Sequence, residues 1–353
     1  LDGAQRAYVE AAQASAEHLL GLVNDLLDYA RLEAGRLEFD PAPVDVETLV
    51  RGVAELLSPR AHDKGLEMVW SVAPDAPDVI ADEGRLRQVL FNLAGNAVKF
   101  TESGGVRIAV ERAGGTEDRP RLAFIVDDSG PGVPIEARAR IFEEFGHAVG
   151  GDAVRHDGAG LGLAVVRRLM AAMGGAAVVE DRPDGPGARF RVEAEFEAAG
   201  REPRGRSLDG RAVAVVSPDA FVRSAARMQL AACGAEVANT AAVTLVDHAE
   251  GARTGRPLAA PAASGRSIVL LKPSERELIA RYRAAGFHGY LIKPLRRASL
   301  AERVLAAAGA GAAPAHAPPE DDRVVPARFA GVRVLLAEDN PVGALLAKTL
   351  LRR

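Results

Sequence analysis

The stretch NLAGNAVKF carries two amides and an ammonium, Asn92, Asn96 and Lys99, spaced four and then three residues apart. On a helix, residues at these spacings lie one above the other, so the three polar groups form one stripe on a segment whose apolar spacing otherwise predicts a core helix. An amide oxygen is a hard, neutral ligand that suits Mg²⁺, and an ammonium one turn further on can contact a phosphate. The stripe therefore indicates a ligand site.

Three glycine-bearing segments follow this stripe, DDSGPGVP at 127–134, DGAGLGL at 157–163 and DGPGARF at 184–190. Each alone is typical of a turn, and a single G-x-G is weak evidence for a ligand. Their order carries more information, because a strand ends in an acid-Gly-x-Gly turn and a second glycine loop opens directly into a helix. Together the segments predict a nucleotide pocket.

The residue types indicate the chemistry of this pocket. Gly158, Gly160 and Gly162 lack Cβ atoms, so backbone N–H groups can approach phosphates, and the positive end of the helix that begins near Leu161 favours negative charge. Asp128, at the end of a buried strand, needs a donor for its carboxylate, and the exocyclic amine of adenine is a suitable one. We therefore predict an adenine nucleotide bound with magnesium.

The elements that must position these residues alternate between helical and strand periods from Leu37 to about Phe196, which makes mixed α/β the economical class. Helices are predicted near 45–62, 83–100, 135–145 and 161–173, and strands near 66–72, 105–111, 121–127, 176–180 and 188–196.

A second domain is predicted after a polar linker at 199–210. Residues 211–308 alternate apolar runs such as AVAVV and SIVLL with amphipathic stretches, a pattern typical of a small doubly wound α/β domain. An Ala/Pro/acidic linker follows at 309–330, and VRVLLAEDNP then begins a second copy of the pattern at 331–353.

Residues 1–36 have an apolar seam with alternating spacings of four and three, from Ala12 through Leu19 to Ala30. Such a seam needs a partner helix. The pattern favours a bundle or dimer helix over a core helix of the following domain. Because the chain begins without methionine, inside a helical pattern, we expect it to be a piece of a larger protein.

Composition narrows the classes of function and location. The net charge of -4 leaves no basic excess for a nucleic-acid backbone, so we expect no nucleic-acid partner. The single cysteine, Cys233, cannot form an internal disulfide, which fits a reducing compartment, and we expect a cytoplasmic setting. The sequence has no apolar run long enough to predict a transmembrane helix.

The ordered motifs N-L-x-x-N-A-x-K-F, D-x-G-x-G, F-E-x-F and G-x-G-L-G-L resemble the catalytic ATP-binding domain of sensor histidine kinases, within the superfamily that includes DNA gyrase and MutL. The resemblance covers about residues 1–197. It implies that 1–36 is the second helix of a dimerisation domain and that 37–198 is the ATP-binding catalytic domain. It further implies ATP and Mg²⁺ as cofactors, a homodimer through the N-terminal helix, and a response regulator or phosphotransfer protein as partner.

Carried over residue by residue, the resemblance implies that Asn96 coordinates Mg²⁺, that Lys99 contacts phosphate and that Asp128 binds the adenine amine. Asn92 stands where the family places an amide or acid beside the reacting phosphate. Arg155, in the predicted lid, either meets the γ-phosphate or is a solvated loop charge. The other positions implied for the ATP site are Phe100, near the base, and Gly130, Gly132, Gly158, Gly160, Leu161 and Gly162, which shape the pocket and its lid.

One part of the family pattern is missing. A histidine kinase needs a phosphoacceptor histidine, normally in an H-E-x-R-x-P box, and this string is absent from the 353 residues. His18 lacks the adjacent acid and the proline, so we interpret it as a helix-surface residue. The chain is therefore expected to supply only the ATP side of a phosphotransfer to a histidine.

Residues 211–308 resemble a response-regulator receiver domain, with the lysine-proline pair of that family at Lys293 and Pro294. Asp247 stands at the position of the phosphoryl acceptor. The acidic pair that would hold Mg²⁺ is replaced by Ser217 and Pro218, so carboxylate ligands for the metal are lost. We therefore expect a degenerate receiver that does not turn over phosphate, with Asp219 left open as a partial substitute for the lost acids.

Two further features complete this interpretation. The hydroxyl position after the fourth strand of the receiver-like domain is taken by Lys272, and little sequence is left for a helix between Val237 and Leu245. The fragment at 331–353 restores an acidic pair at Glu338 and Asp339, which resembles the start of an intact receiver.

Two other functions stay open at this level. A nucleotide-sensing scaffold, or pseudokinase, would bind ATP without phosphotransfer. An ATPase of the gyrase or MutL type would be expected to carry a glutamate base at position 92, and Asn92 argues against it.

Overall fold

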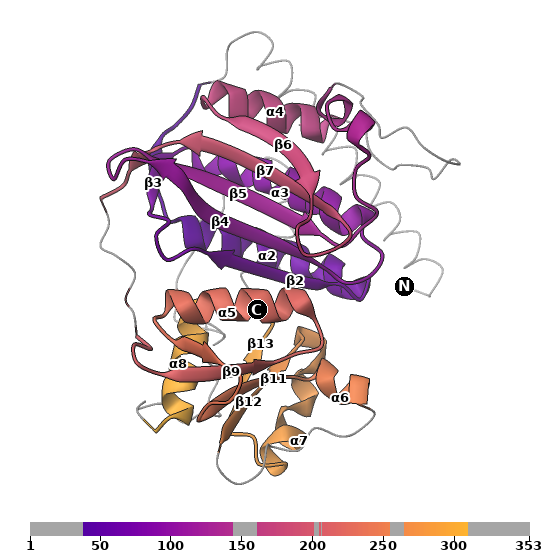
Figure 1. The fold of residues 1–353 in the computed structure, drawn as a ribbon, viewed down its shortest axis with the longest axis vertical. Coiled ribbons are helices and arrows are strands. Elements are labelled where there is room, and N and C mark those ends of the chain that lie inside the picture. Colours follow the sequence, from indigo (N-terminus) through magenta and orange to yellow (C-terminus); the bar gives the residue numbers. More distant parts are fainter. Residues whose placement is uncertain (1–37, 144–160, 201–204, 206, 255–264, 310–353) are drawn as a thin grey trace, which may run out of the picture. The chain divides into compact units, whose positions relative to one another are not determined.

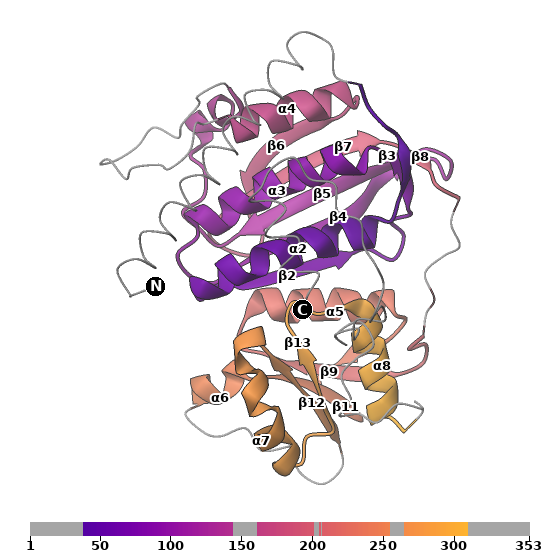
Figure 2. The ribbon, with the colours of Figure 1, turned by 180° about the vertical axis from the view of Figure 1, so that it is seen from behind.

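The structure is a computed structural model, and it describes residues 38–143, 161–200, 205, 207–254 and 265–309. By its contacts the chain divides into a unit at 1–317 and a unit at 318–353. The first unit contains two domains, each built around a five-stranded sheet (Figures 1 and 2).

The first domain, called the catalytic domain below after the prediction from the sequence, contains a five-stranded mixed sheet whose strand order is β2-β4-β5-β7-β6. The only parallel pair in it is β2 with β4, and the other neighbours are antiparallel. Three helices pack on one face of the sheet, as Figure 2 shows. The strands are β2 (Glu67–Val72), β4 (Gly105–Gly115), β5 (Pro120–Asp128), β6 (Ala176–Asp181) and β7 (Ala188–Glu195), and the helices are α2 (Val46–Asp63), α3 (Glu83–Phe100) and α4 (Gly162–Ala172).

The alternation of side chains along each strand explains this layering. In β2, Met68 and Trp70 face the core beneath the helices, and in β4 Val106 and Ile108 do the same. Helices α2 and α3 begin where an aspartate side chain accepts a hydrogen bond from a backbone N–H of the first turn, which offsets part of the cost of starting a helix. The predicted helices and strands of this domain are confirmed to within a few residues, except for the two features that follow.

A small antiparallel sheet of three short strands was not predicted. It consists of β1 (Ala42–Val44), β3 (Val79–Ala81) and β8 (Glu197–Ala198). Strands of two or three residues contain too little alternation to be distinguished from loops in a sequence. They bring the start and the end of the catalytic domain together.

The prediction of a helix near 135–145 is wrong for the described part of this segment, which ends at residue 143. Two 3₁₀ turns, η1 (Ile135–Ala137) and η2 (Arg140–Phe142), stand in its place. Ile141 and Phe142 are buried in the core, so they supply the apolar spacing that suggested a helix. The segment is anchored by these side chains rather than by a continuous ladder of helical hydrogen bonds.

The receiver-like domain has a five-stranded, all-parallel sheet with the order β10-β9-β11-β12-β13, which is the doubly wound arrangement expected from the sequence. Helices α5 and α8 pack on one face of the sheet, and α7 packs on the other. The strands are β9 (Ala212–Val216), β10 (Glu236–Ala238), β11 (Val243–Asp247), β12 (Arg266–Leu271) and β13 (Gly289–Ile292). The helical elements are α5 (Ala220–Ala232), α6 (Ala249–Thr254), η3 (Pro273–Leu278), α7 (Ile279–Ala284) and α8 (Arg297–Ala307).

Between β10 and β11 the chain runs from Ala238 to Val243 without a helix, as the sequence indicated. Leu208, which lies within the predicted linker, is fully buried in the core of the receiver-like domain. Its backbone N–H donates to the carbonyl of Cys233, 2.8 Å away, so this residue anchors the entry into the domain.

Candidate functional site

Helix α3 presents the polar stripe along one side while its other side is part of the core. Leu93 and Ala97 are buried, whereas Asn92 and Asn96 are half-buried and Lys99 is exposed. The Lys99 ammonium lies 5.1 Å from the centre of the Phe100 ring, which is itself 43 % exposed. The stripe is therefore accessible to a ligand along its whole length.

The first amide of the stripe contacts the second glycine segment. Asn92 Nδ2 donates a hydrogen bond to the carbonyl of Gly162, 3.3 Å away, at the first residue of α4. A Cβ at Gly162 would lie 3.6 Å from Asn92 Cγ, an ordinary contact distance, so packing against Asn92 does not itself require a glycine. The free space at this position suits the close approach of a backbone to phosphate oxygens.

Asp128 lies at the end of β5 with its carboxylate held by backbone groups. Its Oδ1 accepts from Gly130 N at 2.8 Å and from Ala188 N at 3.2 Å, and the residue is 6 % exposed. Burial raises the pKa of Asp128 above its ordinary value, and the two backbone N–H donors partly oppose the rise. The hydrogen bonds fix the orientation of Oδ1 and leave Oδ2 to meet a donor such as an exocyclic amine.

Two glycines fit closely around this carboxylate. Gly187 has φ +126° and a Cβ there would lie 1.9 Å from the carbonyl oxygen of Asp128, so no other residue fits without moving the strand end. A Cβ at Gly130 would lie 3.0 Å from Asp128 Oδ1 and 3.3 Å from both the Phe100 carbonyl and Thr101 Oγ1. The first and third glycine segments therefore meet beside the C-terminal end of α3.

Thr101 is a site residue that the sequence reasoning missed. It is fully buried, and its Oγ1 has no hydrogen-bond partner among the described residues, although it lies next to the turn at Gly130. A buried hydroxyl without a partner is costly, so this atom is a ready contact for a bound ligand or water. Gly187 was also missed as an individual residue, although the sequence did single out its glycine-bearing segment.

Several predicted positions lie outside the described residues. These are Arg155, Gly158 and Gly160 in the lid segment, the dimerisation helix at 1–36, and Glu338 and Asp339 in the C-terminal fragment. Among those that are described, Gly132 has φ +76°, which favours glycine, and a Cβ there would approach the carbonyl of Gly187 at 3.1 Å. Leu161 is buried and directly precedes α4.

The remnants of the receiver site meet at the carboxyl ends of the parallel strands. Asp247, at the end of β11, is 0 % exposed. Its Oδ2 accepts from the Ser217 hydroxyl at 2.7 Å, and its Oδ1 accepts from Lys293 Nζ at 3.0 Å and from Ala249 N at 3.2 Å. Ser217 thus occupies the place beside Asp247 where the sequence expectation required an acid.

Treatment with acetyl phosphate and Mg²⁺ is expected to leave Asp247 unphosphorylated. The carboxylate is enclosed and already accepts three hydrogen bonds, and the neighbouring residues Ser217 and Pro218 offer no carboxylate for a metal. Intact-mass spectrometry and phosphate-affinity gels measure the result, with a phosphorylation-competent receiver domain treated in parallel. An aspartyl phosphate mapped to Asp247 would contradict this prediction.

Comparison with known proteins gives the class of the first domain. Residues 81–198 match the family described as histidine kinase-, DNA gyrase B-, and HSP90-like ATPase. The sensory/regulatory protein RpfC of Xanthomonas campestris is 43% identical over 188 residues, which cover 52% of this chain and 26% of RpfC. The sensor histidine kinase GacS of Pseudomonas protegens is 30% identical over 377 residues, which cover 98% of this chain and 40% of GacS.

A solved structure extends the similarity over both domains. The chain in the crystal structure of full-length ShkA in complex with AMPPNP is 51% identical in sequence, and the two structures superpose with a TM-score of 0.78. The match covers 99% of this chain and 73% of the ShkA chain. The chain therefore belongs to the hybrid sensor histidine kinases, with their catalytic ATPase domain followed by a receiver-like α/β domain. It spans about a quarter of the length of RpfC. No helix among the described residues is long and apolar enough to cross a membrane.

Proposed function

We propose that this chain binds Mg-ATP and is the phosphoryl donor part of a histidine kinase, whose acceptor histidine belongs to the parent protein. The observation that carries this proposal is the meeting of three glycine segments at one helix, through Asn92 with Gly162 at one point and Asp128 with Gly130 and Gly187 at another. A response regulator or phosphotransfer protein would receive the phosphoryl group afterwards, in the cytoplasm, from a homodimer joined through residues 1–36.

The roles of the residues follow from their chemistry. Asp128 Oδ2 accepts from the adenine amine, and the backbone at the start of α4 carries partial positive charge toward the phosphates. Asn96 provides an amide oxygen for Mg²⁺, and Lys99 neutralises phosphate charge. When bound, the metal supplies further charge neutralisation for the leaving and transferred groups. The protein contributes position and electrostatics rather than a covalent intermediate.

The chemistry of the residues present fits a magnesium-nucleotide. Asn96 offers a neutral oxygen ligand on the accessible stripe, and Mg²⁺ in nucleotide sites usually takes only one or two protein ligands. Thr101 Oγ1 lacks a partner among the described residues, and Gly162 leaves open the space that a Cβ would fill.

Replacing Asn96 with alanine is expected to weaken Mg-ATP binding about tenfold or more, the size of a lost charge-assisted contact, while leaving the fold intact. Affinity for ATP in EDTA should change much less, because only the metal-dependent part is lost. Isothermal titration calorimetry measures both values. Gln88→Ala is the matched control, since it removes a half-buried amide two turns earlier on α3. Equal affinities for wild type and Asn96→Ala in Mg²⁺ would contradict the assignment.

The test of the kinase function uses the full-length parent protein with ATP labelled at the γ-phosphate. We expect label on a histidine outside this chain, and the label should be stable to base and labile to acid. The scaffold alternative has one observation in its favour, because the receiver-like site holds Asp247 in a closed network. Unlabelled histidines together with retained ATP binding would favour that scaffold.

A further inference from the structure

One side of β2 is buried on the face of the sheet away from the three helices. Glu67, Val69 and Ser71 alternate with the core residues of the strand and are all buried, although β2 is an edge strand. Val69 belongs to the hydrophobic cluster of the receiver-like domain rather than to that of its own domain. The receiver-like domain therefore covers this face of β2.

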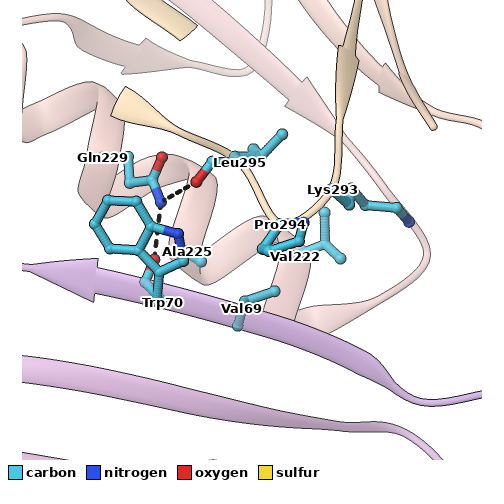
Figure 3. Close-up of a pocket in the computed structure, with 8 residues that line it drawn as sticks. All are labelled: Val69, Trp70, Val222, Ala225, Gln229, Lys293, Pro294 and Leu295. Carbon is cyan, nitrogen blue, oxygen red and sulfur yellow. Dashed lines mark hydrogen bonds between the residues drawn. The ribbon is translucent and has the colours of Figure 1, made fainter. Parts of the chain in front are cut away.

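Helix α5 supplies most of the covering surface. Gln229 is 2 % exposed, and its Nε2 donates to the carbonyl of Trp70 at 2.9 Å and to the carbonyl of Leu295 at 3.1 Å (Figure 3). The Gln229 amide therefore provides a hydrogen-bond donor for the backbone carbonyl of Trp70 on the edge strand β2. A cavity of only about 10 Å³ remains among Val69, Trp70, Val222, Ala225, Gln229, Lys293, Pro294 and Leu295, so the interface is closely packed.

Polar side chains join the two domains beside this packed centre. Arg107 Nη1, on β4, donates to the hydroxyl of Ser224 on α5 at 3.1 Å. On α2, Glu55 pairs with Arg296 at 2.8 Å and Glu47 pairs with Arg297 at 3.4 Å. These last two pairs are partly exposed, so solvent and salt reduce their contribution to the stability of the contact between the domains.

The most buried of the polar contacts involves the receiver-site lysine. Lys293 Nζ lies 3.0 Å from Asp247 Oδ1 in its own domain and 3.0 Å from Glu67 Oε1 on β2. Lys272 Nζ lies 3.2 Å from the same Glu67 oxygen. The Lys293 side chain is 2 % exposed, and that of Lys272 is 21 % exposed. Two ammonium groups at the acceptor site therefore converge on one carboxylate from the catalytic domain.

The Glu67 carboxylate adds a negative charge beside the two ammonium groups when the domains are together. Burial alone lowers the pKa of Lys293, but the carboxylates of Glu67 and Asp247 outweigh it, so the pKa lies above its ordinary value and the ammonium stays charged. Asp219, at the N-cap of α5, is a further carboxylate whose pKa responds to both Glu67 and Lys293. Without Glu67, Lys293 and Lys272 would lose a carboxylate that both of them contact, and a buried charge that loses its partner is costly.

We propose that the acceptor site of the receiver-like domain has become a docking site for the catalytic domain, with the Glu67 carboxylate as the anion that the lysine pair binds. Lys293 and Lys272 hold a carboxylate of the same chain, and Asp247 serves to neutralise Lys293. This inference concerns the receiver-like domain and does not depend on how the nucleotide site acts.

The test is a charge reversal with a rescue, carried out on the intact chain. Glu67→Lys places a third cation against the lysine pair and should separate the domains, whereas adding Lys272→Glu to it restores an opposite charge and should bring them back. Glu83→Lys is the matched control, because Glu83 pairs with Arg87 within α3 and is exposed. Glu67→Gln is the milder variant, which removes the charge and keeps the size.

Two native residues report the outcome. Trp70 is the only tryptophan of the chain and lines the interface cavity, so acrylamide quenching of its fluorescence reports opening, together with hydrogen exchange of the peptide 67–72. Cys233 is the only cysteine, lies buried in the receiver-like core, and has a pKa raised to about 11 by burial. Its protection from a thiol reagent therefore shows that this core stays folded.

In Glu67→Lys we expect the hydrogen-exchange rate of peptide 67–72 to rise about tenfold or more. The reason is that placing like charges together shifts the equilibrium between docked and separated domains by more than a factor of about ten. Quenching of Trp70 should rise with it, Cys233 should stay protected, and Lys272→Glu should reverse most of the change. Unchanged exchange and quenching in Glu67→Lys would overturn the proposal. So would a change that Lys272→Glu fails to reverse, or one that comes with exposure of Cys233.

Discussion

Asp128→Asn is expected to lower the affinity for Mg-ATP about 10- to 100-fold, the size of a hydrogen bond to a charged acceptor. The asparagine carbonyl can still accept from Gly130 and Ala188, so the turn should keep its shape. The other end of the side chain changes from an acceptor to an NH₂ donor, which would face the donor amine of adenine. Calorimetric titration with Mg-ATP measures the loss.

The base itself provides the sharper part of this test. Inosine triphosphate carries a carbonyl where adenine carries the amine, so the wild type should prefer ATP, and Asp128→Asn should lose that preference or reverse it. Asp118→Asn, in the exposed turn before the opposite end of β5, is the matched control and should bind like the wild type. An Asp128→Asn variant that retains a full preference for ATP would remove Asp128 from the adenine site.

The second large effect is expected at the neighbouring residue, where Asp127→Ala should destabilise the catalytic domain by about 3 to 5 kcal/mol. Asp127 is 1 % exposed and accepts from Arg107 Nε at 3.0 Å and from Arg189 Nε at 2.7 Å. Both arginines are its direct cross-strand neighbours, on β4 and β7. Removing the carboxylate leaves two guanidinium groups side by side, and Arg107 is almost fully buried.

Urea unfolding followed by the fluorescence of Trp70, which is part of the catalytic core, measures this loss. Glu193→Ala is the control on β7, because the pair of Glu193 with Arg191 is about one-third exposed and should contribute less than about 1 kcal/mol. If Asp127→Ala and Glu193→Ala unfold at similar urea concentrations, the three charges do not stabilise the sheet as argued.

Much of the fold was predictable because long elements carry their period in the sequence. The stripe of α3 and the strand-to-glycine turn at Asp128 follow from local spacing, and the structure brings Asn92 to Gly162 as a shared pocket requires. The doubly wound class of the receiver-like domain was expected from the alternation of buried runs with amphipathic helices, whereas the order of its strands was not predicted. Local periodicity was sufficient to predict helices longer than about two turns and strands longer than about five residues.

What was not predictable depends on pairs far apart in the chain. Glu67 and Lys293 are 226 positions apart, and nothing near either residue indicates the other. The covering of β2 by α5 likewise comes from tertiary packing, since Val69 and Ser71 have the pattern of an ordinary strand. Thr101 was missed because a single threonine after a helix is typical of many chains. Only its buried hydroxyl, which has no hydrogen-bond partner within the described part of the chain, distinguishes it.

Asp127 and Asp128 are consecutive on β5, and their side chains therefore point to opposite sides of the sheet. A slip of β5 by one position would exchange them, turning Asp128, the carboxylate proposed to bind adenine, toward the two arginines and turning the ion-paired Asp127 toward the proposed nucleotide site. The ion pairs of Asp127 with Arg107 and Arg189 thus fix the register of β5, the strand that carries Asp128, against β4 and β7. One-residue insertions should be tolerated in the turn at 116–119, but within β5 they should cost stability and ligand binding at once.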